Sequence, residues 1–320
     1  MPAESSNTFD IFLERLLSGE KRAISRAITE VEDETPQAEQ LLRKIFPKTG
    51  TAFRIGITGP PGAGKSTLTN ELALHYRKQN LSVGILAVDP TSPFTGGALL
   101  GDRIRMQPAA LDDGVFIRSM ATRGSLGGLS KKAKDAADIL DAAGKDIVIF
   151  ETVGVGQSEL DIAQAADTTV VVLVPESGDA VQAMKAGLME IADVFVMNKS
   201  DRDGANQAVT ALKAILQFRV THEGTEWIPP VVKTIGTSSN GIGDLAAAIE
   251  EHRKFEAATG VLRSARTKQL RERIYELVNE HLNANFWTGE REQYIEQNIG
   301  EVMNRNLSPY DVAEKLTRSG

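Results

Sequence analysis

Cysteine is absent from the 320 residues of this sequence, and histidine occurs only four times, at His75, His222, His252 and His281. The absence of cysteine excludes disulfide bonds, zinc–thiolate sites and cysteine nucleophiles. The four histidines are scattered along the chain, so none of them has the spacing of a metal-ligand pair. A structural transition-metal site is therefore not expected.

Long apolar runs and an excess of basic residues are also missing. No apolar run reaches the roughly 18 residues that a membrane span requires. The net charge is -7, which gives no indication of a nucleic-acid or anionic-membrane partner. The N-terminus has neither an apolar secretory core nor an arginine-rich presequence, so we expect a cytoplasmic protein. With 41% hydrophobic and 25% charged residues, the chain is long enough for one large globular domain with smaller additions.

The most informative stretch is Gly-Pro-Pro-Gly-Ala-Gly-Lys-Ser at residues 59–66, which fits the phosphate-binding pattern G-x-x-x-x-G-K-[ST]. An apolar segment typical of a buried strand precedes it at 53–58, and a helical pattern follows at 67–79. In such a loop, main-chain N–H groups and a helix N-terminus face the phosphates, a lysine reaches the β- and γ-phosphates, and a serine ligates Mg²⁺. We therefore expect nucleotide contacts from Gly59, Gly62, Ala63, Gly64, Lys65, Ser66 and Thr67.

Strand and helix patterns alternate over the middle of the chain. Further strands are predicted at 82–88, 115–118, 147–150, 168–174, 194–197 and 231–235. Polar residues follow several of these strands, among them Asp89, Glu151 and Asn198. In parallel α/β sheets, ligands bind outside the carboxyl ends of the strands. The pattern predicts an α/β fold with a mostly parallel sheet, flanked by helices, and one nucleotide site.

Both ends of the chain are predicted to be helical extensions of this domain. We expect an N-terminal helical extension over 1–50, the nucleotide-binding domain over 51–254 and a C-terminal helical arm over 255–320. The arm carries an apolar stripe that includes Leu270, Ile274 and Leu277. Periodicity alone leaves open whether this stripe packs within the chain or forms the seam of a homodimer.

The tetrapeptide Asn198-Lys199-Ser200-Asp201 follows an apolar strand and matches N-K-x-D, a guanine-reading motif. A carboxylate at Asp201 can accept hydrogen bonds from both the ring N–H and the exocyclic amine of guanine, a pair that adenine lacks. Asn198 can bind the base and tie back to the phosphate loop, while the Lys199 stem covers the base. Thr237-Ser238-Ser239, after the next strand, resembles the last guanine-contacting loop of such proteins.

Three carboxylates compete for the metal, namely Asp89, Asp102 and Glu151. Because Mg²⁺ usually takes only one or two carboxylates besides phosphates and waters, not all three need to bind it directly. Glu151 is followed by Thr-Val-Gly, so the Gly154 amide can bond the γ-phosphate. Val155 stands at the usual position of a water-positioning glutamine, and Gln157 lies two residues further on. We expect slow intrinsic hydrolysis that a partner accelerates.

Four segments resemble the MeaB/ArgK family of GTPases over nearly the whole chain. They are Asp-Pro-Thr-Ser-Pro-Phe-Thr-Gly-Gly at 89–97, Leu-Gly-Asp-Arg-Ile-Arg-Met at 100–106, Arg-Ser-Met-Ala-Thr-Arg-Gly at 118–124 and Glu-Thr-Val-Gly-Val-Gly-Gln-Ser-Glu at 151–159. The resemblance implies that GTP or GDP is bound with Mg²⁺, and that the chain forms a homodimer through the C-terminal arm. It also implies a chaperone role for adenosylcobalamin-dependent methylmalonyl-CoA mutase, in which GTP hydrolysis is coupled to cofactor loading and to protection of the mutase.

The resemblance further implies roles for single residues. Ser66, Asp89, Asp102 and Glu151 correspond to the magnesium and switch region of the family. The stretch 175–185 corresponds to an additional switch that reports the nucleotide to the mutase, and it contains Gln182 and Lys185. From the sequence, Lys185 is equally consistent with an ordinary surface lysine.

Three other functions are alternatives to this one. A kinase of periplasmic binding proteins, an activity that the ArgK name carries, would need an acceptor cleft and a catalytic base, and neither has a signature here. Nickel-insertion GTPases carry clusters of Cys and His ligands, whereas this chain has no cysteine. A binding module with a silent nucleotide would be distinguished by measuring phosphate release.

Overall fold

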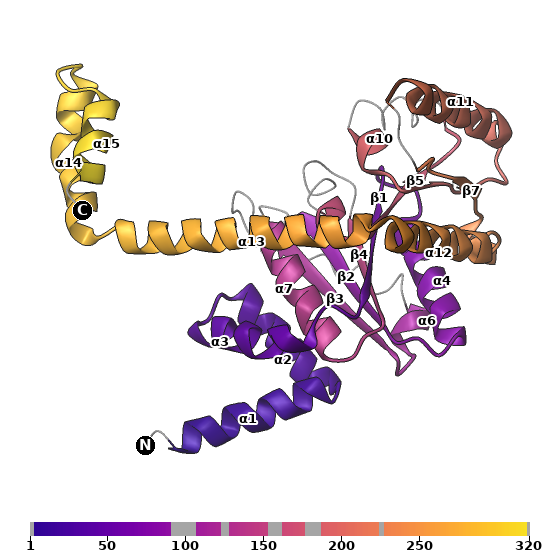
Figure 1. Ribbon diagram of the computed structural model, residues 1–320, viewed down its shortest axis with the longest axis horizontal. Helices are drawn as coiled ribbons and strands as arrows, with labels where there is room; N and C mark the ends of the chain where they lie inside the picture. The colour runs from indigo at the N-terminus through magenta and orange to yellow at the C-terminus, as the bar shows by residue number, and fades with distance from the viewer. Residues whose placement is uncertain are drawn as a thin grey trace. The chain divides into compact units, whose positions relative to one another are not determined.

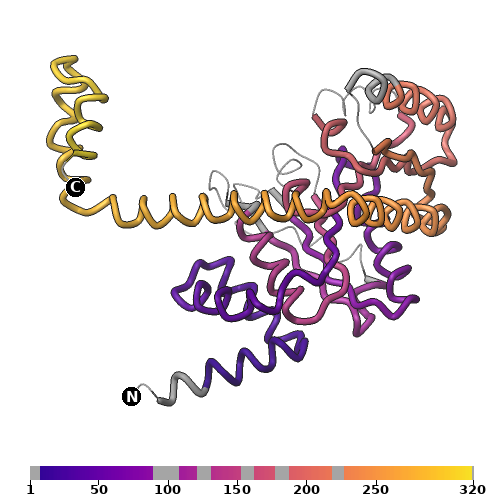
Figure 2. Tube along the Cα trace, viewed as in Figure 1, coloured from indigo at the N-terminus to yellow at the C-terminus, as the bar shows by residue number. Residues whose placement is uncertain are grey.

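A computed structural model describes residues 3–90, 107–122, 128–152, 162–176, 187–223 and 227–318, and the remaining residues are grey in Figure 2. The chain divides into two compact units, Met1–Arg263 and Ser264–Gly320. The larger unit contains the sheet and the phosphate-binding loop, and it therefore carries the candidate site.

Seven parallel strands form the sheet of the larger unit, in the order β3-β2-β4-β1-β5-β6-β7 (Figure 1). Their bounds are β1 (Phe53–Thr58), β2 (Val83–Pro90), β3 (Val115–Thr122), β4 (Ile147–Thr152), β5 (Thr168–Leu173), β6 (Val194–Met197) and β7 (Val231–Lys233). The fold class predicted from the sequence is confirmed. β3 continues beyond the predicted end at residue 118, because residues 119–122 pair with the second half of β2.

Helices cover both faces of this sheet because its central strands are apolar on both faces. Ile147 and Ile149 of β4 belong to the core beneath α4 (Lys65–Lys78) and α12 (Ile242–Thr259), whereas Val148 and Phe150 face the opposite core. The opposite core contains α7 (Gly128–Ala142) and the three N-terminal helices, α1 (Ala3–Leu17), α2 (Lys21–Glu32) and α3 (Pro36–Ile45). A third core lies under α10 (Leu188–Ile191) and α11 (Ala205–Glu223), and the short helix α6 (Gln107–Ala110) packs near α4.

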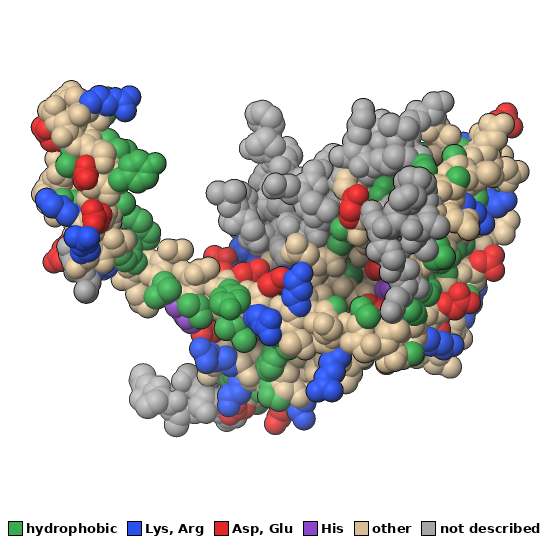
Figure 3. Space-filling view, turned by 45° about the horizontal axis from the view of Figure 1, so that its top comes forward, with side chains coloured by type: hydrophobic (Ala, Val, Ile, Leu, Met, Phe, Trp, Pro, Cys, Tyr) green, Lys and Arg blue, Asp and Glu red, His purple; other side chains and the backbone are tan. Residues whose placement is uncertain are grey.

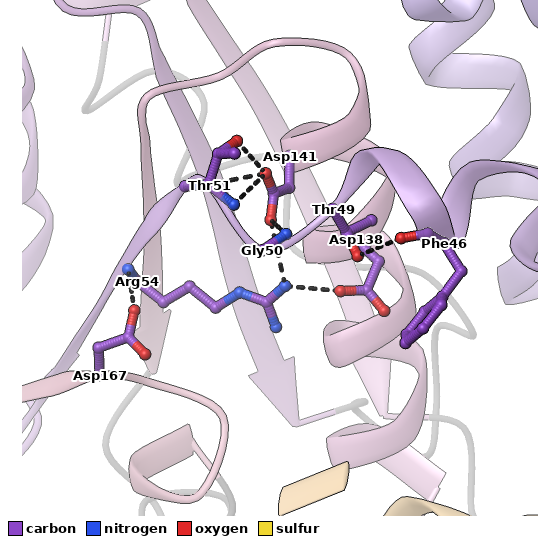
Figure 4. Close-up of polar contacts among 9 residues, drawn as sticks. Phe46, Thr49, Gly50, Thr51, Arg54, Asp138, Asp141 and Asp167 are labelled. Carbon is purple, nitrogen blue, oxygen red and sulfur yellow. Dashed lines mark hydrogen bonds and ion pairs between the residues drawn. The ribbon is translucent and has the colours of Figure 1, made fainter. Parts of the chain in front are cut away.

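The N-terminal helices share a core with the sheet, and a polar network fixes the segment that joins them to β1 (Figure 4). After α3 and η1 (Phe46–Lys48), the chain passes over α7, where the fully buried side chain of Asp141 accepts three main-chain N–H groups. These are the amides of Gly50 (2.7 Å), Thr51 (3.2 Å) and Ala52 (3.0 Å). The guanidinium of Arg54 lies 3.7 Å from the same carboxylate. The 1–50 segment is thereby packed and hydrogen-bonded onto the sheet.

An aspartate directly precedes each of three strands, β4, β5 and β6. In each case, the main-chain N–H of the aspartate donates to the carbonyl oxygen of a residue at the start of the neighbouring strand. The carboxylate of the aspartate accepts a hydrogen bond from the main-chain N–H of that same neighbouring residue. The pairs are Asp146 with Ser82, Asp167 with Arg54 and Asp193 with Thr169, and the carboxylate bonds measure 2.7, 2.9 and 2.7 Å. These carboxylates satisfy main-chain groups at the amino edge of the sheet.

The smaller unit consists of most of α13 (Val261–Phe286) with α14 (Gly289–Met303) and α15 (Pro309–Arg318). Val312 and Leu316 are buried between the last two helices, whereas no side chain of α13 is buried. Within the described residues, no helix combines the length and the apolar character needed to cross a membrane.

Candidate nucleotide site

The phosphate-binding loop connects β1 to α4 in a conformation that depends on glycine. Gly59 has a φ of 136°, and a Cβ placed there would lie 2.1 Å from the carbonyl oxygen of Val172 on β5. Gly64 has a φ of 89°, and a Cβ there would lie 2.5 Å from the side-chain nitrogen of Asn198. Side chains at these positions would push the loop away from its neighbours. The two glycines therefore hold the loop against β5 and against the segment after β6.

Lys65, the first residue of α4, is the cation of this loop and is only 5% exposed. Its ammonium donates hydrogen bonds to the carbonyl oxygens of Gly59 (2.7 Å) and Pro60 (2.9 Å). The charge of Lys65 is therefore held inside the curve of the loop, beside the helix N-terminus. Both features favour an anionic ligand at this place.

The hydroxyl of Ser66 meets a carboxylate from the neighbouring strand. Ser66 donates to Oε1 of Glu151 over 2.5 Å, and Glu151 is buried near the end of β4. The hydroxyls of Thr58 and Thr152 lie 3.0 Å apart and link the ends of β1 and β4. A hydroxyl and a carboxylate in contact are the oxygen donors that Mg²⁺ prefers. In the described residues there is no cluster of three or more His, Cys, Asp or Glu, and a magnesium site of this type does not need one.

Asn198 connects the end of β6 to the phosphate loop and is 3% exposed. Its amide nitrogen donates to the carbonyl of Ala63 (2.7 Å), and its amide oxygen accepts from the Thr234 hydroxyl (3.0 Å) and from the Gly236 amide (3.2 Å). The ammonium of Lys199 donates to the carbonyl of Gly62 (2.8 Å). The candidate guanine motif is thus bonded directly to the candidate phosphate loop, as the sequence interpretation requires of one site.

The third predicted segment also lies at this edge. Thr237 and Ser238 belong to η2 (Gly236–Ser238), and Gly236 packs against Thr67 of α4, since a Cβ on Gly236 would lie 3.3 Å from the Thr67 methyl group. The Ser239 hydroxyl donates to Oε2 of Glu71 on α4 over 2.5 Å. Asp201 is exposed, in the turn after Asn198 and Lys199. Residues 59–67, 198–201 and 236–239 therefore surround the N-terminal half of α4.

Other predicted residues are placed only in part or lie outside the described residues. Asp89 is near the end of β2, where its backbone aligns with Ala121 of β3, so it lies at the same edge as Glu151. Asp102, Gly154, Gln157, Gln182 and Lys185 lie outside the described residues. Their roles stay predictions.

Sequence reasoning missed three contacts that shape this site. These are the hydroxyl pair of Thr58 and Thr152, the bond from Thr234 to Asn198 and the bond from Ser239 to Glu71. Threonine after a strand and glutamate in a helix are too common to be singled out from one sequence. Thr234 could not be found by searching for polar residues after each strand, because it lies inside the strand predicted at 231–235, whereas β7 ends at Lys233.

Comparisons with known proteins identify the family of this chain. The family model described as methylmalonyl Co-A mutase-associated GTPase MeaB matches residues 24–291, which is most of the chain. The chain belongs to the MeaB family of GTPases. A protein from Pyrococcus abyssi is 48% identical to this chain, covering 97% of this chain and 96% of its own. The GTPase ArgK of Escherichia coli is 37% identical, covering 93% of this chain and 92% of its own.

Among solved structures, the crystal structure of an LAO/AO transport system kinase is similar to this one. The TM-score is 0.71 at 31% identity, and the match covers 98% of this chain and 97% of that one. The likeness therefore extends over the whole length of both chains. Membership of the MeaB family makes hydrolysis of GTP the reaction of this protein.

Proposed function

We propose that this MeaB-family GTPase is a chaperone for methylmalonyl-CoA mutase, coupling GTP binding and hydrolysis to adenosylcobalamin loading and to protection of the mutase from inactivation. The observation that carries the proposal is the match of residues 24–291 to a family named for its association with that mutase. The name of one relative is also consistent with this proposal. The mitochondrial methylmalonic aciduria type A homolog of Mus musculus is 32% identical over 95% of this chain and 77% of its own.

The phosphates would be bound by the loop and the start of α4. Lys65 would exchange its bonds to the Gly59 and Pro60 carbonyls for bonds to phosphate oxygens. Each new bond joins two opposite charges, so it is stronger than the neutral-acceptor bond that it replaces. The main-chain N–H groups of residues 62–67 and the helix dipole would supply the remaining positive potential.

Mg²⁺ would be held by Ser66 and, directly or through water, by Glu151, because their oxygens already converge. When bound, Mg²⁺ neutralises charge on the β- and γ-phosphates during transfer to water. Asp89 lies at the same sheet edge, while Asp102 enters this site only through the family resemblance. In the same way, Gly154, Gln157, Gln182 and Lys185 are proposed to contribute to hydrolysis and its coupling to the mutase.

Guanine selection is assigned to Asp201, beside Asn198 and Lys199. The substitution Asp201→Asn should move preference from GTP toward xanthosine triphosphate, because the new amide can donate to the extra carbonyl of xanthine. We expect the ratio of the two affinities to change by about a hundredfold, measured by calorimetry with the diphosphates. Asp203→Asn, two residues away in the same exposed turn, is the matched control. Unchanged guanine selectivity in Asp201→Asn would remove this role from Asp201.

The partner is tested with the mutase itself. The chain is expected to co-purify with an adenosylcobalamin-dependent methylmalonyl-CoA mutase, and GTP turnover is expected to rise in the complex. Substitution of Gln182 or Lys185 should reduce mutase-stimulated turnover more than basal turnover. Equal losses in both assays would exclude a coupling role for these two residues, and absence of both binding and stimulation would contradict the chaperone proposal.

A homodimer is proposed through the smaller unit, where apolar side chains remain uncovered. On α13, Leu270, Ile274 and Leu282 are exposed. A cavity of about 370 Å³ in the same unit is lined by Phe286, Ile295, Ile299, Val302, Val312 and Leu316, among others. Apolar side chains gather along one side of the α14–α15 pair (Figure 3). Light scattering should give twice the chain mass, and Ile274→Glu should give monomers that still bind GDP.

A kinase is the second candidate, because the similar solved structure is named as one. The GTPase and kinase functions are distinguished by where the γ-phosphate is found after the reaction. A GTPase releases it as inorganic phosphate, whereas a kinase leaves it on a transport binding protein. Transfer of labelled phosphate to such a protein at the rate of nucleotide turnover would favour the kinase.

A further inference from the structure

A side-chain contact ties the guanine-facing turn to the helix that carries Lys65. Oε2 of Glu71 on α4 accepts from the hydroxyl of Ser239 over 2.5 Å. Ser239 has a φ of 55°, a left-handed conformation that a serine adopts only when its surroundings hold it there. The turn is closed by the bond from the Ile235 amide to the Asn240 carbonyl (3.0 Å). The bond to Glu71 therefore holds a turn whose local conformation is costly.

Glu71 is itself oriented by its neighbour on α4. Its Oε1 accepts from the side-chain nitrogen of Asn70 (3.0 Å), and the side-chain oxygen of Asn70 accepts the Ala109 amide (3.1 Å). Asn70 is only 4% exposed, so its own position is fixed by packing. Each carboxylate oxygen of Glu71 therefore has a defined donor. The carboxylate is a preset anchor for Ser239 rather than a mobile surface group.

The other end of the same turn is anchored to the base motif. The Gly236 amide donates to the Asn198 side chain (3.2 Å), and the Ser238 amide donates to the Ile235 carbonyl (3.0 Å). The Thr237 amide lies between these two amides, in η2. A purine with a keto oxygen at position 6 needs a donor beside it, whereas an amino group at that position would meet the amide as a second donor. The turn can thus supply a contact different from the one assigned to Asp201.

We propose that Glu71 is a positioning residue for guanine recognition: through Ser239 it holds the 236–239 turn so that a main-chain N–H, that of Thr237, faces the keto oxygen of the base. This inference rests on the proposed guanine site and extends it. Asp201 reads the ring N–H and the exocyclic amine, while the turn held by Glu71 reads the keto oxygen. One helix, α4, then fixes the phosphate group through Lys65 and the base through Glu71.

The affinities for three nucleoside diphosphates, GDP, 6-thio-GDP and IDP, distinguish the contact to the keto oxygen from the contact to the exocyclic amine. Relative to GDP, 6-thio-GDP replaces the keto oxygen by the weaker acceptor sulfur, whereas IDP lacks only the exocyclic amine. The wild-type chain should prefer GDP over both. In Glu71→Ala and in Ser239→Ala, the preference for GDP over 6-thio-GDP should fall by about fivefold, the value of one ordinary hydrogen bond. The preference for GDP over IDP should stay within twofold of the wild type, because Asp201 is unaltered.

Two further variants make the experiment specific. Glu71→Gln keeps an acceptor for the Ser239 hydroxyl, so it should recover most of the lost preference. Glu251→Ala removes an exposed glutamate of α12 and should leave both ratios unchanged. Calorimetric titration gives the affinities, and thermal unfolding of each variant shows that it is folded.

The outcomes are distinguishable. An unchanged preference for GDP over 6-thio-GDP in both Glu71→Ala and Ser239→Ala would overturn the role of Glu71. Equal loss of both preferences would also overturn it, because that result describes a general loosening of the site. If the wild-type chain does not prefer GDP over IDP, the assignment of the guanine site to Asp201 is wrong. The role of Glu71, which depends on that site, is then contradicted as well.

Discussion

Polar side chains join separate segments at both edges of the parallel sheet, but the two edges differ in the charged group that a ligand could engage. At the amino edge, Asp146, Asp167 and Asp193 each accept a main-chain amide of the adjoining strand, and Asp141 accepts three from the segment before β1. These bonds join parts of the chain to one another. At the carboxyl edge, the ammonium of Lys65 donates to the carbonyl oxygens of Gly59 and Pro60 in its own loop.

The difference follows from what each edge has to bind. The carboxylates at the amino edge keep their hydrogen bonds to main-chain amides, so they contribute to the stability of the folded chain and order the segments that they join. The Lys65 ammonium could bind phosphate oxygens more strongly than carbonyls, so its present bonds can be exchanged. We expect substitutions at the amino edge to change folding, and substitutions at the carboxyl edge to change nucleotide affinity.

The largest effect is expected for Lys65→Ala. Removing the ammonium deletes charge-assisted bonds to the phosphates, which are worth about 1.5–3 kcal/mol each. The affinity for GTP, measured by calorimetry with a non-hydrolysable analogue, should fall by several hundredfold, or about 3–4 kcal/mol. Lys78→Ala, at the other end of α4, should leave it unchanged. Undiminished affinity in Lys65→Ala would contradict the assignment of the phosphate site and the comparison between the edges.

Asp141→Ala should produce the largest effect at the amino edge. The substitution leaves the amides of Gly50, Thr51 and Ala52 without their acceptor and removes a carboxylate 3.7 Å from Arg54. We expect a loss of about 3 kcal/mol in the free energy of unfolding, measured by urea denaturation. The GDP affinity of the folded protein should not change. Asp138→Ala, which removes one bond to Arg54, should cost about 1 kcal/mol.

A smaller, pH-dependent effect is expected at Asp193. Burial raises the pKa of this carboxyl to about 7, against the lowering effect of the Thr169 amide. The ring of His252, whose Nε2 lies 3.4 Å from the Asp193 carboxylate, has its pKa lowered to about 4, chiefly by burial. Between the ordinary aspartate value of 3.8 and the raised pKa of about 7, the folded protein keeps a proton on Asp193 that the unfolded chain releases. The stability due to protonated Asp193 is therefore fully present below about pH 3.8 and is lost as pH rises from there through the raised pKa of about 7.

His252 acts in the opposite direction. Between about pH 4 and pH 6.5, the unfolded chain binds a proton on this histidine, whereas buried His252 in the folded protein stays neutral. The contribution of His252 to the free energy of unfolding therefore rises with pH up to about 6.5. The substitution Asp193→Asn removes the ionisation at the carboxyl. It should stabilise the protein by about 1 kcal/mol at pH 8, a modest value because the Asp193 side chain is 32% exposed. At pH 5, which lies within the window between 3.8 and about 7, the effect should be smaller. Equal melting-temperature shifts at the two pH values would contradict the raised pKa of Asp193.

Most strands were predictable because they are short apolar segments, rich in β-branched or aromatic residues, next to a turn. The run Thr-Thr-Val-Val-Val-Leu of β5, for example, has few alternatives to a buried strand. The end of β3 was not predictable, since residues 119–122 are less apolar and are strand only because β2 pairs with them. The role of the aspartates at the amino edge was not predictable either. An aspartate before a strand reads as an ordinary turn residue until the neighbouring strand brings an amide to it.

The sequence by itself determined which groups are offered to a nucleotide at the candidate site, because the motifs around Lys65 and Asn198 contain the groups that phosphate and guanine require. It also determined the layer order of helices and parallel strands, since periodicity records which side of each segment is apolar. Only the tertiary structure decided that the Ser239 hydroxyl meets Glu71, that Thr234 holds Asn198 and that Asp141 closes the segment before β1. Such contacts join residues 36 to 168 positions apart, and a pairing over that separation depends on how the packed strands and helices approach, which no local pattern encodes.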